Sequence, residues 1–120
     1  MKREFVHAEL FEKSWKALGL TDDDLRIFQG FLQENISKGD IINGTGGARK
    51  IRWALDKGKS GGIRIIYVDF EIYEKVYLML AYPKSVKDNL GDKEKKFLKN
   101  ISDQIAKELD KKSKFRREEF

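Results

Sequence analysis

The segment Gly44 to Tyr67, GTGGARKIRWALDKGKSGGIRIIY, predicts two β-strands joined by a loop rich in glycine and lysine. In the first strand, residues 49–55, apolar and basic side chains alternate, which is the pattern of a strand with one buried face. The second strand, residues 63–68, is apolar on both faces apart from Arg64, as expected for the central strand of a sheet. We therefore expect this hairpin to form the middle of the fold.

The hairpin also carries the excess positive charge of the chain. Residues 49–64 contain one acid, Asp56, and six basic side chains: Arg49, Lys50, Arg52, Lys57, Lys59 and Arg64. Their net charge equals the formal charge of +5 for all 120 residues, so the remainder of the chain is neutral. A positive field confined to one hairpin indicates a polyanionic partner.

The composition is that of one domain spanning residues 1–120. An apolar content of 40%, with 8 Phe, 4 Tyr and 2 Trp, supplies a core. The absence of cysteine excludes disulfides and thiolate metal sites and agrees with a reducing compartment. No apolar run approaches the ~20 residues of a membrane span, and the start MKREF does not resemble a secretory signal. We expect a cytoplasmic protein without membrane contact.

Apolar periodicity predicts further elements on both sides of the hairpin. They are a strand at 3–7, helices at 10–18 and 21–38, a strand at 76–84 and a helix that begins at Gly91 or Asp92. The order β-α-α-β-β-β-α predicts an α+β fold, in which an antiparallel sheet carries its helices on one face. The apolar period is lost at 111–120, and we expect a frayed tail there.

Alternation along the last strand places Leu78, Tyr82 and Lys84 on one face and Ala81 on the other. Because Tyr82 and Lys84 end this strand, they could converge with Arg64. The alternative is an aromatic ring at the edge of the core beside a lysine that extends to solvent.

Arg64 is the strongest candidate for a functional residue. A guanidinium among isoleucines costs free energy unless it has a partner or a ligand, and no acid lies on its strand before Asp69. For Lys57 and Lys59, a functional role and an ordinary place on a solvated loop are equally open.

Several kinds of catalytic site are excluded by the residue types present. The single histidine, His7, has no predicted partner for a catalytic triad or a metal site, so we expect a surface or packing role. The glycine-rich segments lack the spacing of a P-loop or a dinucleotide fingerprint. Helix capping explains Asp22 to Asp24 better than metal binding does. We expect no metal and no cofactor.

Four segments together, GTGGARKIRWA, GKSGGIRIIY, YLMLAYPKS and NLGDKEKKFLKNI, resemble the RelE/HigB superfamily of bacterial toxins, and in particular its HigB-like branch. The resemblance is strongest from Ile41 to Leu98. It implies a RelE-like sheet packed against two N-terminal helices, with an additional C-terminal helix. It also implies a metal-independent endoribonuclease that cleaves mRNA in the ribosomal A site. Its partners would be the ribosome, mRNA and a cognate antitoxin, a helix-turn-helix protein similar to HigA.

The resemblance also implies roles for individual residues, in a reaction in which a ribose 2′-hydroxyl attacks the adjacent phosphate. Arg64 matches an arginine expected to stabilise the transition state. The implied catalytic set is Arg64, Tyr82, Lys84 and Lys59. The implied RNA-binding set is Arg49, Lys50, Arg52, Lys57 and Ser60. A predicted helix occupies the region where other members place a tyrosine or histidine, so the resemblance assigns no general base.

Two other functions fit parts of this pattern. A ParE-like toxin has a similar fold but inhibits DNA gyrase, and the basic hairpin and Tyr82 argue against it. A non-catalytic RNA-binding module would bind RNA in a salt-dependent way without cleaving it. Cleaved transcripts in cells that express the protein would distinguish the nuclease from both.

Overall fold

The central strand of the structure is β4, which lies between two antiparallel neighbours, β3 and β5. The computed structural model describes residues 2–54, 62–85 and 89–118, with side chains up to Ser113. Within these residues one sheet has the strand order β1-β5-β4-β3-β2. The strands are β1 (Glu4–His7), β2 (Asp40–Ile41), β3 (Ala48–Trp53), β4 (Ile63–Phe70) and β5 (Lys75–Pro83). The prediction that the basic hairpin forms the middle of the sheet is confirmed.

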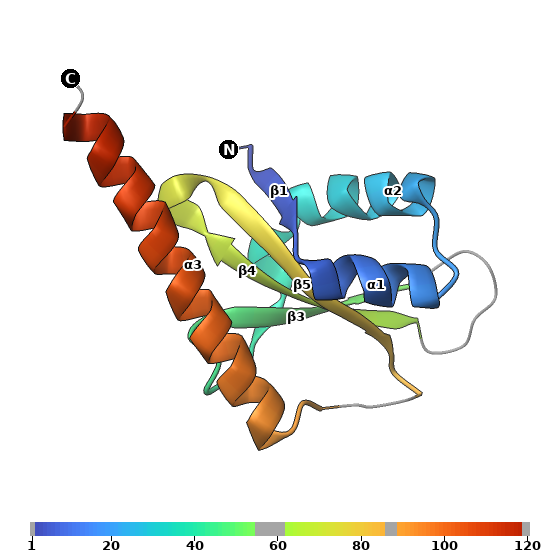
Figure 1. The fold of residues 1–120 in the computed structure, drawn as a ribbon. Helices are drawn as coiled ribbons and strands as arrows, with labels where there is room; N and C mark the ends of the chain where they lie inside the picture. Colours follow the sequence, from blue (N-terminus) through green and yellow to red (C-terminus); the bar gives the residue numbers. More distant parts are fainter. Residues whose placement is uncertain (1, 55–61, 86–88, 119–120) are drawn as a thin grey trace.

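Three helices cover the sheet from both sides (Figure 1). The helices α1 (Glu9–Ala17) and α2 (Asp22–Gln33) pack against one face, where Phe11 and Phe28 meet Ile65 of β4. The long helix α3 (Asp92–Glu118) packs against the other face, where Leu98 belongs to the same cluster as Ile66. The α+β class is confirmed, but the expectation that all helices share one face is wrong. Residues 65 and 66 alternate in direction, and each face of β4 is apolar enough to bury a helix.

The edge strand β1 differs from the expected antiparallel arrangement, because it runs parallel to β5 with Phe5 opposite Val76. A parallel pair needs a long crossover connection, and the whole segment between the two strands supplies one. Alternation of side chains is the same in both kinds of pair, so the sequence pattern could not distinguish them.

A β-bulge in β5 changes which of its side chains share a face. Ile66 pairs with Leu80 but Tyr67 pairs with Leu78, so Met79 is the additional residue of the bulge. Beyond the bulge, Ala81 packs in the same cluster as Phe11 and Phe28, which we call the α1–α2 cluster. Tyr82 packs in the same cluster as Leu98, which we call the α3 cluster. The prediction that Leu78 and Tyr82 share a face is therefore wrong, since one extra residue reverses the alternation.

The turn between α1 and α2 forms as the sequence predicts. Gly19 follows α1 in the left-handed conformation, with φ of 76°. Thr21 caps α2, because its Oγ1 accepts a hydrogen bond from the Asp24 amide at 3.1 Å. The Asp24 carboxylate in turn accepts from the Thr21 amide at 2.9 Å, which completes a capping box.

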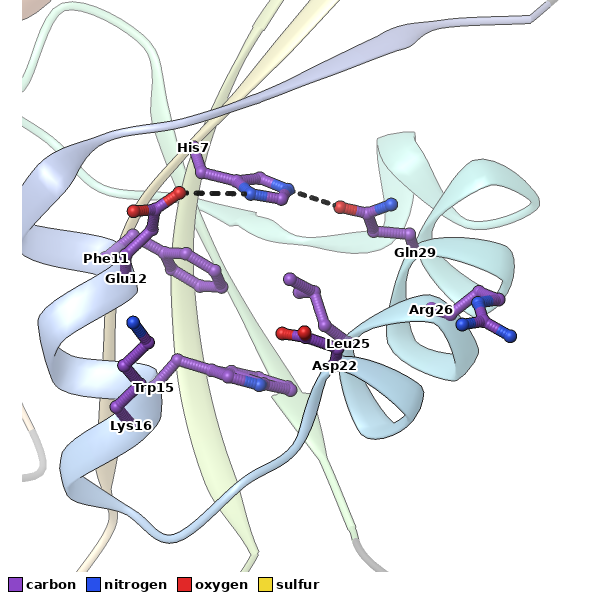
Figure 2. Close-up of a pocket in the computed structure, with 9 residues that line it drawn as sticks. All are labelled: His7, Phe11, Glu12, Trp15, Lys16, Asp22, Leu25, Arg26 and Gln29. Atoms are coloured by element: carbon purple, nitrogen blue, oxygen red, sulfur yellow. Dashed lines mark hydrogen bonds and ion pairs between the residues drawn. The ribbon is translucent and has the colours of Figure 1, made fainter.

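The histidine has the packing role expected of it, and it joins three elements (Figure 2). His7 leaves β1 with its Nε2 at 2.5 Å from Oε1 of Gln29 on α2 and its Nδ1 at 3.7 Å from Oε1 of Glu12 on α1. These residues line one side of a pocket of about 400 Å³ between the two helices, with Trp15 on the other side.

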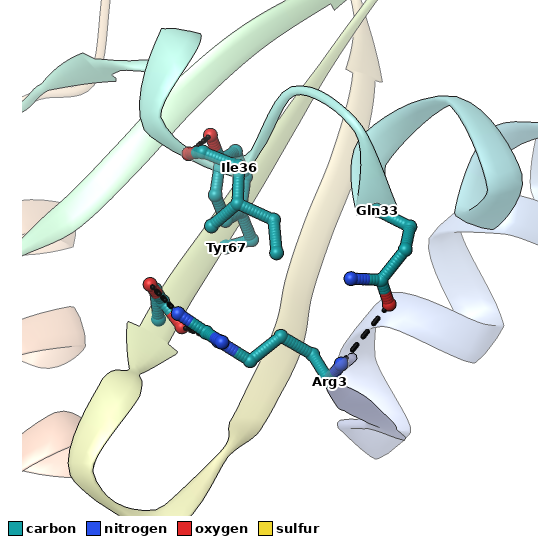
Figure 3. Close-up of polar contacts among 5 residues, drawn as sticks. Arg3, Gln33, Ile36 and Tyr67 are labelled. Atoms are coloured by element: carbon teal, nitrogen blue, oxygen red, sulfur yellow. Dashed lines mark hydrogen bonds and ion pairs between the residues drawn. The ribbon is translucent and has the colours of Figure 1, made fainter. Parts of the chain in front are cut away.

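Two sets of polar contacts hold the C-terminal half of the central strand (Figure 3). The hydroxyl of Tyr67 donates to the Ile36 carbonyl at 2.6 Å and accepts from the Gly39 amide at 3.1 Å. Burial raises the pKa of this phenol, against the opposing effect of the Gly39 amide. Arg3 donates to both carboxylate oxygens of Asp69, at 2.9 and 3.3 Å, and these hydrogen bonds raise the pKa of its guanidinium.

The helical segments end at positions that differ from the predicted ones. The second helix stops at Gln33 and is followed by a 3-10 turn at Ile36–Lys38. The last helix is assigned as far as Glu118 and so includes residues 111–118, and fraying in this part of the chain stays a prediction. Lys, Arg and Glu are good helix formers, so the helix extends past the end of its apolar stripe. None of the helices in the described residues is long and apolar enough to cross a membrane.

Candidate active site

Arg64 is the second residue of the central strand β4, and it lies on the sheet face that carries α3. In the register of the sheet it lies opposite Arg52 of β3 on one side and opposite Tyr82 of β5 on the other. Its exposed fraction is only 8%, because Ile66 and the neighbouring strands surround it. Its Nη1 is buried and has no hydrogen-bond partner among the described residues. A desolvated guanidinium nitrogen without a partner is costly, and it marks a place where an acceptor from outside could bind.

The pairing of Arg52 with Arg64 adds a second unfavourable contribution. Like charges directly opposite one another on neighbouring strands destabilise a sheet. The nearest acid along β4, Asp69, is engaged by Arg3 in a hydrogen-bonded ion pair. Arg52 is exposed whereas Arg64 is buried, so one guanidinium lies at the surface and its neighbour lies within the sheet. A bound polyanion would relieve both the repulsion and the missing hydrogen bond.

The structure brings Tyr82 beside Arg64 and Arg52, and we call these three residues the Arg64 cluster. Lys84 lies at the margin of this cluster. Tyr82 is 7% exposed and packs in the α3 cluster with Leu90 and Leu98. Lys84 follows Pro83, the last residue of β5, and is exposed in a turn. The expected convergence of Tyr82 with Arg64 is present in the strand register.

The two basic residues at the start of β3 serve different faces. Arg49 pairs with Tyr67, and its Nη1 donates to the carbonyls of Gly39 at 2.7 Å and Ser37 at 3.2 Å. It therefore holds the segment before β2 and does not join the Arg64 cluster. Lys50 lies on the same face as Arg52, and its Nζ donates to Asn89 Oδ1 at 3.3 Å.

The remaining predicted site residues belong to the loop between β3 and β4. Lys57, Lys59 and Ser60 lie outside the described residues.

One feature beside the site could not be found from the sequence. A pocket of about 190 Å³ lies between β2 and the beginning of α3, and its polar residues include Asp40, Asn89 and Lys95. Asp40 belongs to a two-residue strand, too short for periodicity to predict, and Asn89 precedes the last helix. Only the pairing of β2 with β3 could have indicated that these residues lie near Lys50.

No group of three or more His, Cys, Asp or Glu residues within 2–54, 62–85 and 89–118 is arranged to hold a metal ion. The pocket at His7 lies between α1 and α2, on the opposite side of the sheet from the Arg64 cluster. The polar groups at the described site are the guanidiniums of Arg52 and Arg64, the ammonium of Lys50 and the phenol of Tyr82.

Comparison with known proteins identifies the family. A model of the RelE toxin of the RelE/RelB toxin–antitoxin system matches residues 3–116. The structure is similar to that of an Escherichia coli RelE mutant, in which two arginines are replaced by alanine, in the free state. The TM-score is 0.53 at 16% sequence identity, over 73% of this chain and 90% of that one, which supports the fold. The chain belongs to the RelE family of toxins, the toxin components of toxin–antitoxin systems, and a cognate antitoxin is its partner.

Proposed function

We propose that this toxin is a ribosome-dependent endoribonuclease that cleaves mRNA in the A site and so inhibits translation. The observation that carries the proposal is the row Arg52–Arg64–Tyr82 across three strands, with the buried Nη1 of Arg64 unpaired among the described residues. RelE toxins are known as endoribonucleases. Because ribosomes translate mRNA in the cytoplasm, we propose that the toxin acts there.

The reaction that suits this row is attack by a ribose 2′-oxygen on the adjacent phosphorus. The bond from phosphorus to the 2′-oxygen forms and the bond to the 5′-oxygen breaks, leaving a 2′,3′-cyclic phosphate and a 5′-hydroxyl. Extra negative charge develops on the phosphate oxygens in the transition state. A guanidinium fixed by the sheet can donate two parallel hydrogen bonds to those oxygens, and its stabilisation is larger because the site is shielded from water.

The proton transfers fall to the other members of the catalytic set. The 2′-hydroxyl must lose a proton and the 5′-oxygen must gain one. Tyr82, opposite Arg64, carries a phenol that can exchange a proton with the reacting group. The ammonium groups of Lys84 and Lys59 are the candidates for the donor to the leaving oxygen. The RNA backbone would be held by Arg52, Lys50, Lys57 and Ser60. Arg49 instead contributes to the fold of the segment before β2.

The antitoxin that we propose is a helix-turn-helix protein similar to HigA, in agreement with the HigB-like segments of the sequence. It would bind through an acidic or amphipathic segment near the sheet or its basic loop. Binding that is insensitive to salt and to charge reversal at Lys57 and Lys59 would contradict the electrostatic part of this proposal.

The decisive experiment compares ribosome-bound and naked mRNA as substrates for the purified toxin. We expect cuts on programmed ribosomes with the A site occupied by mRNA, and little cleavage of the same mRNA alone, because the ribosome positions the scissile phosphate. Salt-dependent RNA binding without cleavage under both conditions would favour a binding module. Inhibition of gyrase with intact transcripts would favour a ParE-like toxin. Efficient cleavage of naked mRNA, free of contaminating nuclease, would overturn ribosome dependence.

A further inference from the structure

We propose that the pocket beside Lys50 binds one base of the mRNA next to the scissile phosphate, and that Asp40 selects a base with an amino group. This inference rests on the proposed function, since it names the part of the substrate that a neighbouring subsite recognises. The pocket has a volume of about 190 Å³. The residues that line it include Asp40, Ile42, Lys50, Asn89, Leu90 and Lys95.

The pocket lies on the same face of the sheet as Arg64. Asp40 is the register partner of Lys50, and paired residues share a face. Lys50 lies two residues before Arg52 on β3, a distance of about 7 Å along the strand. A base that enters the pocket can therefore belong to a nucleotide whose backbone lies at the Arg52–Arg64 pair.

A second link between the pocket and the site is apolar. Leu90 lines the pocket, is 7% exposed and belongs to the same packed cluster as Tyr82. Ile42 also lines the pocket, and it is half-buried and packs against the same cluster. Apolar walls of this kind suit the faces of a flat ring, whereas a phosphate group would lose its hydration between them.

The polar groups of the pocket indicate which base would bind. The ammonium of Lys50 is hydrogen-bonded to Asn89. Its register partner Asp40 has no ion pair or side-chain hydrogen bond with another described residue. A carboxylate only accepts hydrogen bonds. Cytosine, adenine and guanine present an amino donor, whereas uracil presents carbonyl oxygens in its place. Asp40 should therefore favour the first three bases and disfavour uracil.

The charges around the pocket are mixed, which favours a nucleotide over a simple phosphate. Two ammonium groups, of Lys50 and Lys95, would attract a phosphate, but the carboxylate of Asp40 opposes its entry. The same arrangement suits a nucleotide whose backbone stays with the lysines while its base reaches the carboxylate.

The experiment measures base preference in the wild-type toxin, in Asp40→Asn, and in Asp23→Asn as a control that removes the same charge. Asp23 lies on α2, where it pairs with Arg26. Programmed ribosomes would carry mRNAs that differ in one nucleotide at each position flanking the cut. At one position we expect the wild type to cleave the amino-bearing bases about tenfold faster than uracil, the lower range for one good base contact. An asparagine can donate as well as accept, so Asp40→Asn should lose most of that ratio and Asp23→Asn should keep it.

A binding measurement separates this inference from the proposed function. Short 2′-O-methyl oligonucleotides of cytidine or uridine cannot be cleaved by this chemistry, and their affinity is measured by fluorescence anisotropy. The cytidine probe should bind the wild type and Asp23→Asn more tightly than the uridine probe, and Asp40→Asn should bind both alike. If the wild type shows this preference but cuts no mRNA, the pocket stands and the nuclease proposal fails. If Asp40→Asn keeps the wild-type preference in cleavage and in binding, the pocket inference is wrong.

Discussion

Two polar residues on the central strand, Arg64 and Tyr67, are both buried but differ in how their polar atoms are satisfied. The hydroxyl of Tyr67 has two backbone partners, from the segment between α2 and β2. The Nη1 of Arg64 has none within the described residues. Buried polar groups in native proteins are almost always hydrogen-bonded. We infer that Tyr67 serves stability and that Arg64 serves a ligand.

The tight contact between Gly39 and Tyr67 predicts a specific pattern of stability. Gly39 has φ of −65° and ψ of 142°, which alanine adopts freely, but an added methyl group would overlap the Tyr67 hydroxyl. Gly39→Ala should cost about 1–3 kcal/mol, the range for overpacking. Tyr67→Phe should cost about 1–3 kcal/mol, because two backbone groups lose their partner. In the double variant, Gly39→Ala should cost less than it does alone, since the hydroxyl is gone. Urea unfolding of the four proteins measures this, and strictly additive losses would contradict the contact.

The raised pKa of Tyr67 predicts a loss of stability in alkali. The unfolded phenol titrates near pH 10.0, and burial holds the folded pKa above that value. The folded state therefore keeps its proton where the unfolded state has lost it, so stability is complete below pH 10 and falls as pH rises toward the folded pKa. Tyr67→Phe should lack this part of the decline, measured by urea unfolding between pH 9 and 11. Parallel curves for the two proteins would show that Tyr67 does not titrate differently on folding.

At the residue scale, the sequence predicted the candidate site where local pattern determines it. Arg64 could be recognised because a basic residue within an apolar strand is unusual. The partners of Arg49 could not, because Ser37 and Gly39 approach it only after the chain folds back through β2. The face of Tyr82 depended on a bulge at Met79, for which the sequence has no glycine or proline as a signal.

At the scale of elements, the capping box of α2 predicts how one threonine supports the helical pair. Thr21→Ala removes the acceptor for the Asp24 amide and should cost about 1 kcal/mol. Thr21→Ser keeps a hydroxyl in place and should cost much less. Urea unfolding of both variants checks this. Equal losses in the two variants would mean that the cap contributes little.

Helices and long strands were predictable for the same reason that caps are. Their signals lie within a few residues, as at Gly19 and Thr21. The short strand β2 and the parallel direction of β1 depend on partners far away along the chain. The placement of α3 on the second face likewise depends on the whole sheet, since its own stripe shows only that one side is apolar.

At the scale of the whole molecule, the two faces of the sheet differ in what they carry. One face is closed by α1 and α2 around an aromatic core, in which Trp15 stacks with Phe11 and Trp53. The other face carries α3 and, in the same layer, the Arg52–Arg64–Tyr82 row. The positive field on this second face is what a ribonucleic acid substrate requires.

Family membership predicts the effect of the protein on a cell. Expression in a bacterium without the antitoxin should stop translation and growth, as measured by amino-acid incorporation and colony counts. Co-expression of the cognate antitoxin should restore both. Normal growth at verified expression of folded protein would contradict a toxin that acts on translation.

Arg64→Lys tests most directly whether Arg64 stabilises the transition state through the geometry of its guanidinium. Lysine keeps the charge but loses the planar fork that can bind two phosphate oxygens at once. The measurement is the single-turnover rate of mRNA cleavage on programmed ribosomes, with ribosome affinity and thermal stability measured on the same preparations. Arg52→Lys is the matched control, because Arg52 is the exposed register partner of Arg64.

We expect Arg64→Lys to lower the cleavage rate by about 10²-fold or more, the effect of removing one fixed charge-stabilising donor. Ribosome affinity should change little, because the other basic residues still attract the phosphates, and Arg52→Lys should be mild in both measurements. A folded Arg64→Lys variant that cleaves at nearly the wild-type rate would contradict the account and leave Arg64 as a general anchor for the RNA backbone.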